Sequence, residues 1–72
     1  MDNTPIGHFI RTRRRQLKLT QIELSKKAGV GLRFIRDLEQ GKSSLRTDTV
    51  NKVLALFGKC LGPVDMPREM RE

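Results

Sequence analysis

Residues 19–42 of this chain read LTQIELSKKAGVGLRFIRDLEQGK, and this stretch predicts the fold. It opens with Thr20-Gln21-Ile22-Glu23, a Thr-x-x-Glu pattern in which each end residue caps the other's backbone N–H at a helix start. A helix is therefore expected from about residue 20 to residue 28. Gly29 follows, and glycine most easily takes the left-handed conformation that ends a helix. A second helix is expected from about residue 31 to residue 40, where Gly41 ends it.

Two short helices joined by a tight glycine turn have the geometry of a helix-turn-helix. In that motif the first turns of the second helix can enter the DNA major groove. Val30, Ile35 and Leu38 are the apolar residues expected to anchor this second helix, so that its other face stays outward. Ser25 is expected where the two helices cross closely, because a small side chain permits that approach.

The segment before this stretch predicts a first helix. Thr4-Pro5 is a start signal, a capping hydroxyl followed by proline at the first helical position, and the helix is expected to run to about Leu17. Ile6, Ile10 and Leu17 recur at helical spacing, and Arg14 completes their stripe. The other basic residues here are expected to point elsewhere: Arg11, Arg13, Arg15 and Lys18.

A fourth helix is predicted after the loop at residues 42–46. Either Thr47 or Asp48 is expected to cap it, and Gly58 to end it. Its inward face follows an i, i+3, i+4, i+7 pattern made by Val50, Val53, Leu54 and Phe57. The chain thus divides into a helical domain at residues 1–58 and a tail at residues 59–72.

The tail contains Gly62, Pro63 and Pro67 and has no helical period. A short strand is expected at Cys60-Leu61 or near Val64, and the remainder is predicted to be mobile. The prediction of an all-α fold for residues 1–58 does not depend on that strand.

The amino-acid composition indicates which class of partner the protein binds. Fifteen Lys and Arg face eight Asp and Glu, which gives a net charge of +7 in 72 residues. A small basic chain most often meets a polyanion, nucleic acid first and an anionic membrane second. The sequence has no Trp and no Tyr, no long apolar run and no signal-peptide pattern, so the membrane reading is the weaker one.

Cys60 is the only cysteine, so an internal disulfide and a zinc cluster are both excluded, and a reducing cytoplasm is expected. A chain of this length buries a marginal core, which favours oligomerisation. No metal, cofactor or catalytic site is predicted, because His8 lacks partners at ligand spacing and no nucleophile, paired-carboxylate or phosphate-loop pattern occurs.

The residues also carry a resemblance. Thr20-Gln21-x-Glu23-Leu24-Ser25-x-x-Ala28-Gly29-Val30, followed by Ile35-x-x-Leu38-Glu39-x-Gly41-Lys42, resembles the Cro/C1 (Xre) family of helix-turn-helix regulators from about Ile6 to Phe57. Residues 33–42, with Arg46-x-Asp48-x-Val50-x-Lys52-Val53-Leu54, are most similar to HipB-type antitoxins. The resemblance implies an all-α bundle of four to five helices, with or without a short C-terminal strand at a dimer interface.

The same resemblance implies a DNA-binding surface. The positions that would read base edges are Leu32, Arg33, Arg36 and Asp37. Those that would contact the DNA backbone are Gln21, Gly31, Lys42, Ser43 and Thr47. Arginine suits guanine, whose O6 and N7 accept two parallel hydrogen bonds, although a solvated helix face is the plain alternative. Asp37 either accepts from cytosine or, as we prefer, orients Arg33 four residues earlier.

Four positions have further expectations. Arg14 and Glu39 match an inward ion pair of the family and are interpreted as structural. Phe34 is assigned either to packing beside the fourth helix or to the DNA backbone. At Gly31 the family usually has Ser or Thr, and glycine there removes one polar contact while capping nearly as well.

The function expected from the resemblance is a cytoplasmic, homodimeric repressor that binds an inverted-repeat operator in double-stranded DNA. Its narrower form is an autoregulating antitoxin whose partner is a HipA-type toxin with a kinase-like fold. One alternative is a stand-alone phage-type or restriction-controller regulator. Another is a protein-interaction module that retains the helix-turn-helix fold.

Overall fold

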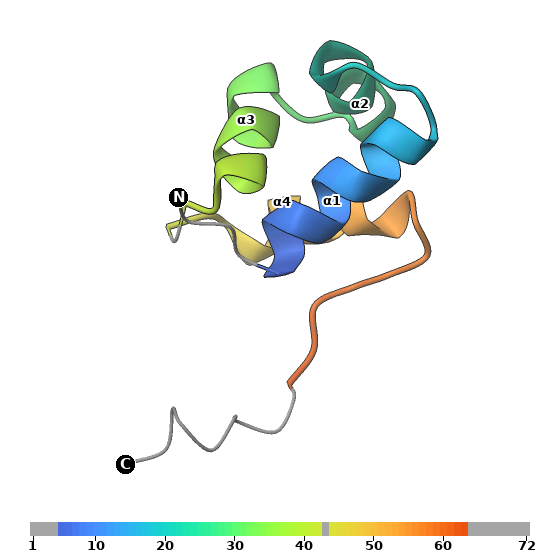
Figure 1. Ribbon diagram of the computed structural model, residues 1–72. Helices are drawn as coiled ribbons and strands as arrows, with labels where there is room; N and C mark the ends of the chain where they lie inside the picture. The colour runs from blue at the N-terminus through green and yellow to red at the C-terminus, as the bar shows by residue number, and fades with distance from the viewer. Residues whose placement is uncertain (1–4, 43, 64–72) are drawn as a thin grey trace.

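The fold is seen in a computed structural model, which describes residues 5–42 and 44–63. Within these residues the chain forms four α-helices and no strand (Figure 1). Their bounds are α1 Pro5–Gln16, α2 Gln21–Ala28, α3 Leu32–Gln40 and α4 Thr47–Ala55. The predicted all-α helix-turn-helix fold is confirmed.

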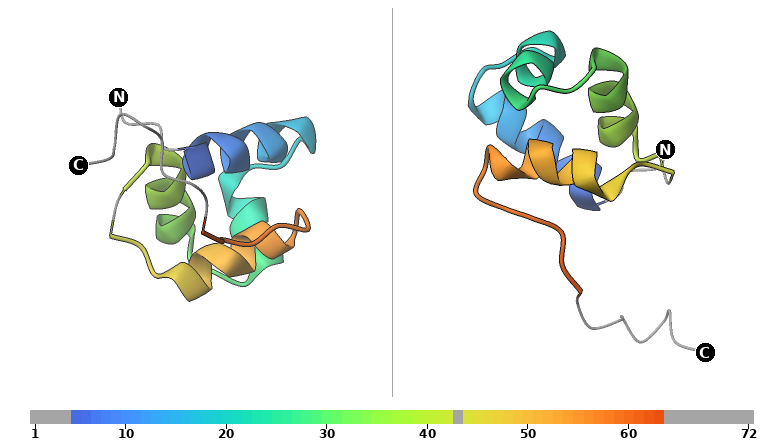
Figure 2. Two further views of the ribbon diagram at one scale, coloured as in Figure 1. Left: turned by 90° about the horizontal axis from the view of Figure 1, so that it is seen from below. Right: turned by 180° about the vertical axis from the view of Figure 1, so that it is seen from behind.

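One hydrophobic core joins the four helices. Its fully or nearly fully buried members are Ile10, Leu24, Ile35, Leu38, Val50, Val53 and Leu54. The helix α3 packs against both α1 and α2, and the left view of Figure 2 shows α1 and α4 on opposite sides of the bundle. Each helix therefore contributes one apolar stripe to a shared centre, which is how amphipathic helices of this length become stable.

The first helix ends at Gln16, one residue before the predicted end at Leu17. Ile10 is fully buried and Ile6 packs against the core, but the side chain of Leu17 is 55% exposed, so its predicted inward position is wrong. The reason is that α1 stops at Gln16 and the backbone reverses at Lys18, whose φ is 58°. The predicted cap at Thr4 lies outside the described residues.

The capping box that starts α2 is confirmed. The backbone N–H of Glu23 donates to the Thr20 hydroxyl at 3.0 Å, and the N–H of Thr20 donates to Glu23 Oε1 at 2.8 Å. Leu24, one residue beyond this box, is completely buried. Two orphan N–H groups are thus satisfied where the chain leaves the reversal at Lys18.

The turn between α2 and α3 depends on Gly29. Its φ is +72°, in the left-handed region, and its N–H donates to the carbonyl of Lys26. The N–H of Val30 then donates to the carbonyl of Ser25 at 3.0 Å, which completes the helix end. Ser25 is buried, as expected of a small residue near this crossing. The turn fixes the direction in which α3 leaves α2.

The start of α4 differs from the prediction. The residue at the N-cap is Arg46, with no side-chain capping bond, so neither Thr47 nor Asp48 occupies that position. Asp48 instead lies in the first turn, where its carboxylate accepts from the N–H of Thr49 and pairs with Arg46 at 3.0 Å. A carboxylate in the first turn of a helix is stabilising, because it lies near the positive end of the helix dipole.

The predicted strand at Cys60-Leu61 is absent from residues 59–63, which follow an irregular path. The backbone N–H of Leu61 donates to Asn51 Oδ1 at 2.7 Å, and its side chain packs against the core. This donor, which a strand would use in pairing, is thereby held by α4 of the same chain. The alternative strand near Val64 lies outside the described residues.

Candidate nucleic-acid interface

The outward face of α3 carries two arginines. Arg36 is exposed, and the side chain of Arg33 is 82% exposed, while Ile35 and Leu38 on the same helix are buried. Residues three apart share one face of a helix, so the two guanidinium groups project from the same side. That side carries positive charge on a helix whose other side is fixed in the core.

Asp37 lies beside Arg33 on α3. The Asp37 carboxylate lies 3.6 Å from the Arg33 Nε, one turn along the helix. This spacing is longer than a good hydrogen bond and fits a loose, solvent-screened pair. Leu32, at the first position of α3, is half-buried.

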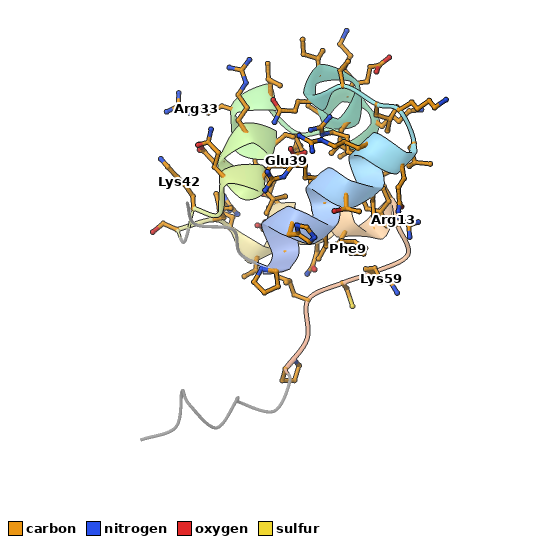
Figure 3. All side chains as sticks on the ribbon, viewed as in Figure 1. Phe9, Arg13, Arg33, Glu39, Lys42 and Lys59 are labelled. Atoms are coloured by element: carbon orange, nitrogen blue, oxygen red, sulfur yellow. The ribbon has the colours of Figure 1, made fainter. Side chains whose placement is uncertain are left out.

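The predicted backbone-contact residues lie around this helix. Gly31 is the N-cap of α3 and is exposed, with no side-chain capping bond. Lys42 is exposed just after Gly41, and Thr47 is exposed at the start of α4. Ser43 lies outside the described residues. Figure 3 shows Arg33 and Lys42 on the same side of the molecule.

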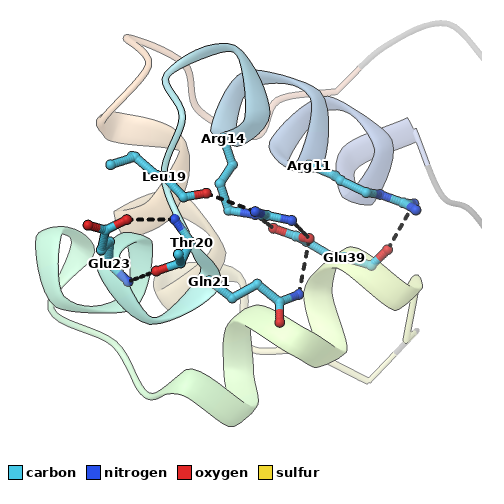
Figure 4. Close-up of polar contacts among 7 residues, drawn as sticks. All are labelled: Arg11, Arg14, Leu19, Thr20, Gln21, Glu23 and Glu39. Atoms are coloured by element: carbon cyan, nitrogen blue, oxygen red, sulfur yellow. Dashed lines mark hydrogen bonds and ion pairs between the residues drawn. The ribbon is translucent and has the colours of Figure 1, made fainter.

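Gln21 begins α2, and its side chain is held within the protein. Its Nε2 donates to Glu39 Oε1 at 3.2 Å (Figure 4). An amide NH₂ carries two hydrogens, so one donor stays available to a phosphate. The start of α2 also presents backbone N–H groups and the positive end of the helix dipole.

Glu39 joins three elements at the end of α3. Its carboxylate accepts from Arg14 Nε at 2.7 Å and from Arg14 Nη2 at 3.0 Å, and it is only 4% exposed. The hydrogen bond with Glu39 raises the pKa of Arg14 above its ordinary value, although burial opposes this. The contact lies inside the bundle, so it links α1 to α3 instead of facing DNA.

Two contacts around this pair were missed by the sequence reasoning. Arg11 Nη2 donates to the backbone carbonyl of Glu39 at 3.3 Å, and Arg14 Nη1 donates to the carbonyl of Leu19 at 2.9 Å. The first satisfies a carbonyl in the last turn of α3, and the second ties α1 to the segment before α2. Both depend on backbone positions in other elements, which no side-chain pattern reveals.

Arg13, which was expected to point away from the apolar stripe of α1, is half-buried against aromatic rings. Its guanidinium carbon lies 5.9 Å from the centre of the Phe9 ring and 5.5 Å from that of the Phe57 ring. The two rings meet edge to face with centroids 6.0 Å apart. Arg13 is therefore part of a cation–π cluster that joins α1 to the segment after α4. The cluster exists because Phe57, although beyond the end of α4, folds back towards α1.

The remaining predicted positions include Phe34 and His8. Phe34 is half-buried and packs against the core, which fits the packing alternative. His8 is exposed, and no group of three potential metal ligands occurs among the described residues. None of the described helices is long and apolar enough to span a membrane.

Comparison with known proteins identifies the family. The sequence profile of the helix-turn-helix family HTH_3 matches residues 10–60, which is most of the chain and includes all of α2, α3 and α4. This chain is a member of that helix-turn-helix family. An uncharacterized HTH-type transcriptional regulator, y4mF, from Sinorhizobium fredii (strain NBRC 101917 / NGR234) is 43% identical over 67 residues. That similarity covers 93% of this helix-turn-helix protein and 87% of the relative.

Proposed function

We propose that this helix-turn-helix protein is a sequence-specific transcriptional repressor that binds an inverted repeat in double-stranded DNA as a homodimer. The observation that carries the proposal is the exposed pair Arg33 and Arg36 on α3, a helix anchored by buried Ile35 and Leu38. A rigid helix with outward arginines can place a guanidinium against guanine O6 and N7. The relative named as a transcriptional regulator supports the same class of function.

The backbone contacts are proposed on both sides of α3. Gln21 and Gly31 offer donors at helix starts, and Lys42 and Thr47 are exposed beyond its end. Such contacts would set the position of the protein on the duplex without reading its sequence. Base reading is assigned to Arg33 and Arg36, and Asp37 to orienting Arg33.

The homodimer is proposed to form over an apolar groove beside the start of α1. A groove of about 550 Å³ lies between the first turns of α1 and residues 59–63, and its apolar walls include Ile6, Phe9 and Leu61. A domain this small gains stability by covering such a surface with a second copy. Half-sites would then lie about one helical turn apart, roughly 34 Å.

The narrower proposal is that the protein is the antitoxin of a HipA/HipB-type pair and represses its own operon. The similarity of residues 33–42 and 46–54 to HipB-type antitoxins supports it. A stand-alone transcriptional regulator is the second candidate, since the name of the relative mentions regulation and no toxin. Co-expression separates the two: the product of the neighbouring gene should slow growth alone and be tolerated together with this protein.

The DNA-reading proposal is tested by Arg36→Ala. Selected operator DNA should bind the variant about 1–3 kcal/mol more weakly, with preference relaxed at one base pair. Lys42→Ala should weaken operator and random DNA by similar factors, because a phosphate contact carries no sequence information. An equal loss on both DNAs for Arg36→Ala, measured by fluorescence anisotropy, would show that Arg36 does not read bases.

A further inference from the structure

A second groove opens between the C-terminal ends of α1 and α4. Three large apolar side chains are exposed among the described residues, and two of them, Leu17 at 55% and Leu56 at 44%, line this one groove. Its volume is about 390 Å³. The complete lining is Leu17, Leu19, Leu24, Lys27, Leu56 and Phe57. We call it the Leu17–Leu56 groove; it does not share a lining residue with the groove assigned to the second copy.

Positive charge borders this groove. Lys27 forms part of the wall, and Arg13 lies over the Phe57 ring that forms another part. The Arg13 Nε is buried and has no hydrogen-bond acceptor, and no carboxylate in residues 5–42 and 44–63 forms an ion pair with this side chain. Within the described part of the chain, this guanidinium thus lies against two aromatic rings and has no counter-charge.

A second copy of this chain carries the same net charge of +7, so it is a poor source of the missing anion. Each of the four described acidic side chains is engaged within its own chain: Glu23 with Thr20, Asp37 with Arg33, Glu39 with Arg14 and Asp48 with Arg46. Charge complementarity therefore favours a different protein as the source of the anion. Arginine is also enriched in protein–protein interfaces and at their binding hot spots.

We propose that the Leu17–Leu56 groove is the docking site for the partner toxin, through a segment with a carboxylate flanked by apolar side chains. The apolar side chains pack between Leu17 and Leu56, and the carboxylate pairs with Arg13 at the border. The inference rests on the antitoxin function proposed above. It adds the surface and the chemistry of the partner segment.

The position of the groove allows DNA and the partner to be held together. In Figure 3, Arg13 and Lys59 lie on the opposite side of the molecule from Arg33 and Lys42. The groove's border residue Arg13 and the base-reading helix therefore face different directions. Docking would leave α3 accessible, so one dimer can bind operator and partner at once.

The test measures the affinity of the full chain for the purified product of the neighbouring gene, by calorimetry, for two matched pairs of surface variants. Leu56→Ser is expected to weaken binding at least 10-fold, whereas Ile22→Ser, which is similarly exposed but outside the groove, changes it less than 2-fold. Lys27→Gln is expected to weaken binding about 3- to 10-fold, and Lys26→Gln, its exposed neighbour outside the groove, is the control. Operator affinity of Leu56→Ser should be unchanged.

Arg13→Gln adds the charge test. Affinity of the wild type should fall as salt is raised, and this fall should be smaller for Arg13→Gln, provided that circular dichroism shows the variant folded. If both groove variants bind like their controls, the docking site is wrong while the antitoxin function stands. If the wild type binds no neighbouring product, both proposals fail. The oligomeric mass of Leu56→Ser is also measured without the partner protein. If this substitution converts the dimer to a monomer, the groove belongs to the homodimer interface and the inference is overturned.

Discussion

Three consecutive arginines show how one residue type takes three roles. Arg13 stacks on two aromatic rings, Arg14 forms the ion pair with Glu39 inside the bundle, and Arg15 is exposed. Successive residues of a helix are about 100° apart around its axis, so the three side chains of α1 point into three different environments. Sequence periodicity separates Arg14 from the other two, but the rings that hold Arg13 come from the tertiary structure.

Arg14→Ala is expected to lower the free energy of unfolding by about 3–5 kcal/mol, because it leaves the buried Glu39 carboxylate without its main partner. The exposed Arg15→Ala is the control and should cost about 0–1 kcal/mol. Urea titrations of both variants provide the measurement. Equal midpoints would mean that the pair contributes nothing to the fold.

At the scale of elements, the turn between α2 and α3 depends on backbone conformation and not on packing. A side-chain Cβ at Gly29 or at Gly31 would meet no atom within 4 Å. The two positions differ only in backbone, since Gly29 has a φ of +72° and Gly31 a φ of −73° in the extended region. Substitutions at these two sites should therefore have opposite effects on stability.

Gly29→Ala should destabilise the protein by roughly 1–2 kcal/mol, because a Cβ is disfavoured in the left-handed region. Gly31→Ser should stabilise it by about a few tenths of a kcal/mol, since serine can cap the first turn of α3. Thermal unfolding of the two variants beside the wild type checks both signs. A stabilised Gly29→Ala would show that this turn does not need the left-handed conformation.

The capping box of α2 should also make stability depend on pH. Hydrogen bonds with the Thr20 backbone and hydroxyl lower the pKa of Glu23 below its ordinary 4.5. When folding lowers the pKa of a carboxyl group, the ionised group stabilises the folded protein at pH values above the unfolded-state pKa. This stabilisation is lost as the pH falls through the folded-state pKa. The melting-temperature difference between wild type and Glu23→Ala should therefore be largest near neutrality and shrink below 4.5. A difference that stays constant from about pH 3 to about pH 7 would exclude this linkage.

For the whole molecule, the net charge of +7 and its distribution set the behaviour of the proposed DNA complex. Each phosphate neutralised releases counterions, so operator affinity should fall with salt at a slope of about −0.9 per contact. Lys42→Ala should reduce this slope by about 1. Lys59→Ala, on the opposite side in Figure 3, should leave it unchanged, and filter-binding assays over a salt series measure both. Identical slopes for both variants would remove Lys42 from the interface.

The local features of the fold could be predicted from the sequence. The cap at Thr20 and Glu23 and the helix ends at Gly29 and Gly41 depend on backbone within a few residues, so their residue types identify them. The buried positions of α3 follow from helical spacing for the same reason. The outward positions of Arg33 and Arg36 are then a consequence of this register.

Only the tertiary structure decided which distant groups meet. The exposure of Leu17, the stacking of Arg13 and the bond from Gln21 to Glu39 depend on where α1 ends and how α2 and α4 cross it. Likewise, Asn51 takes the Leu61 N–H that strand pairing would have used, a contact between residues ten positions apart. Short-range hydrogen bonds are encoded by neighbouring residue types, whereas such contacts require the relative placement of whole helices.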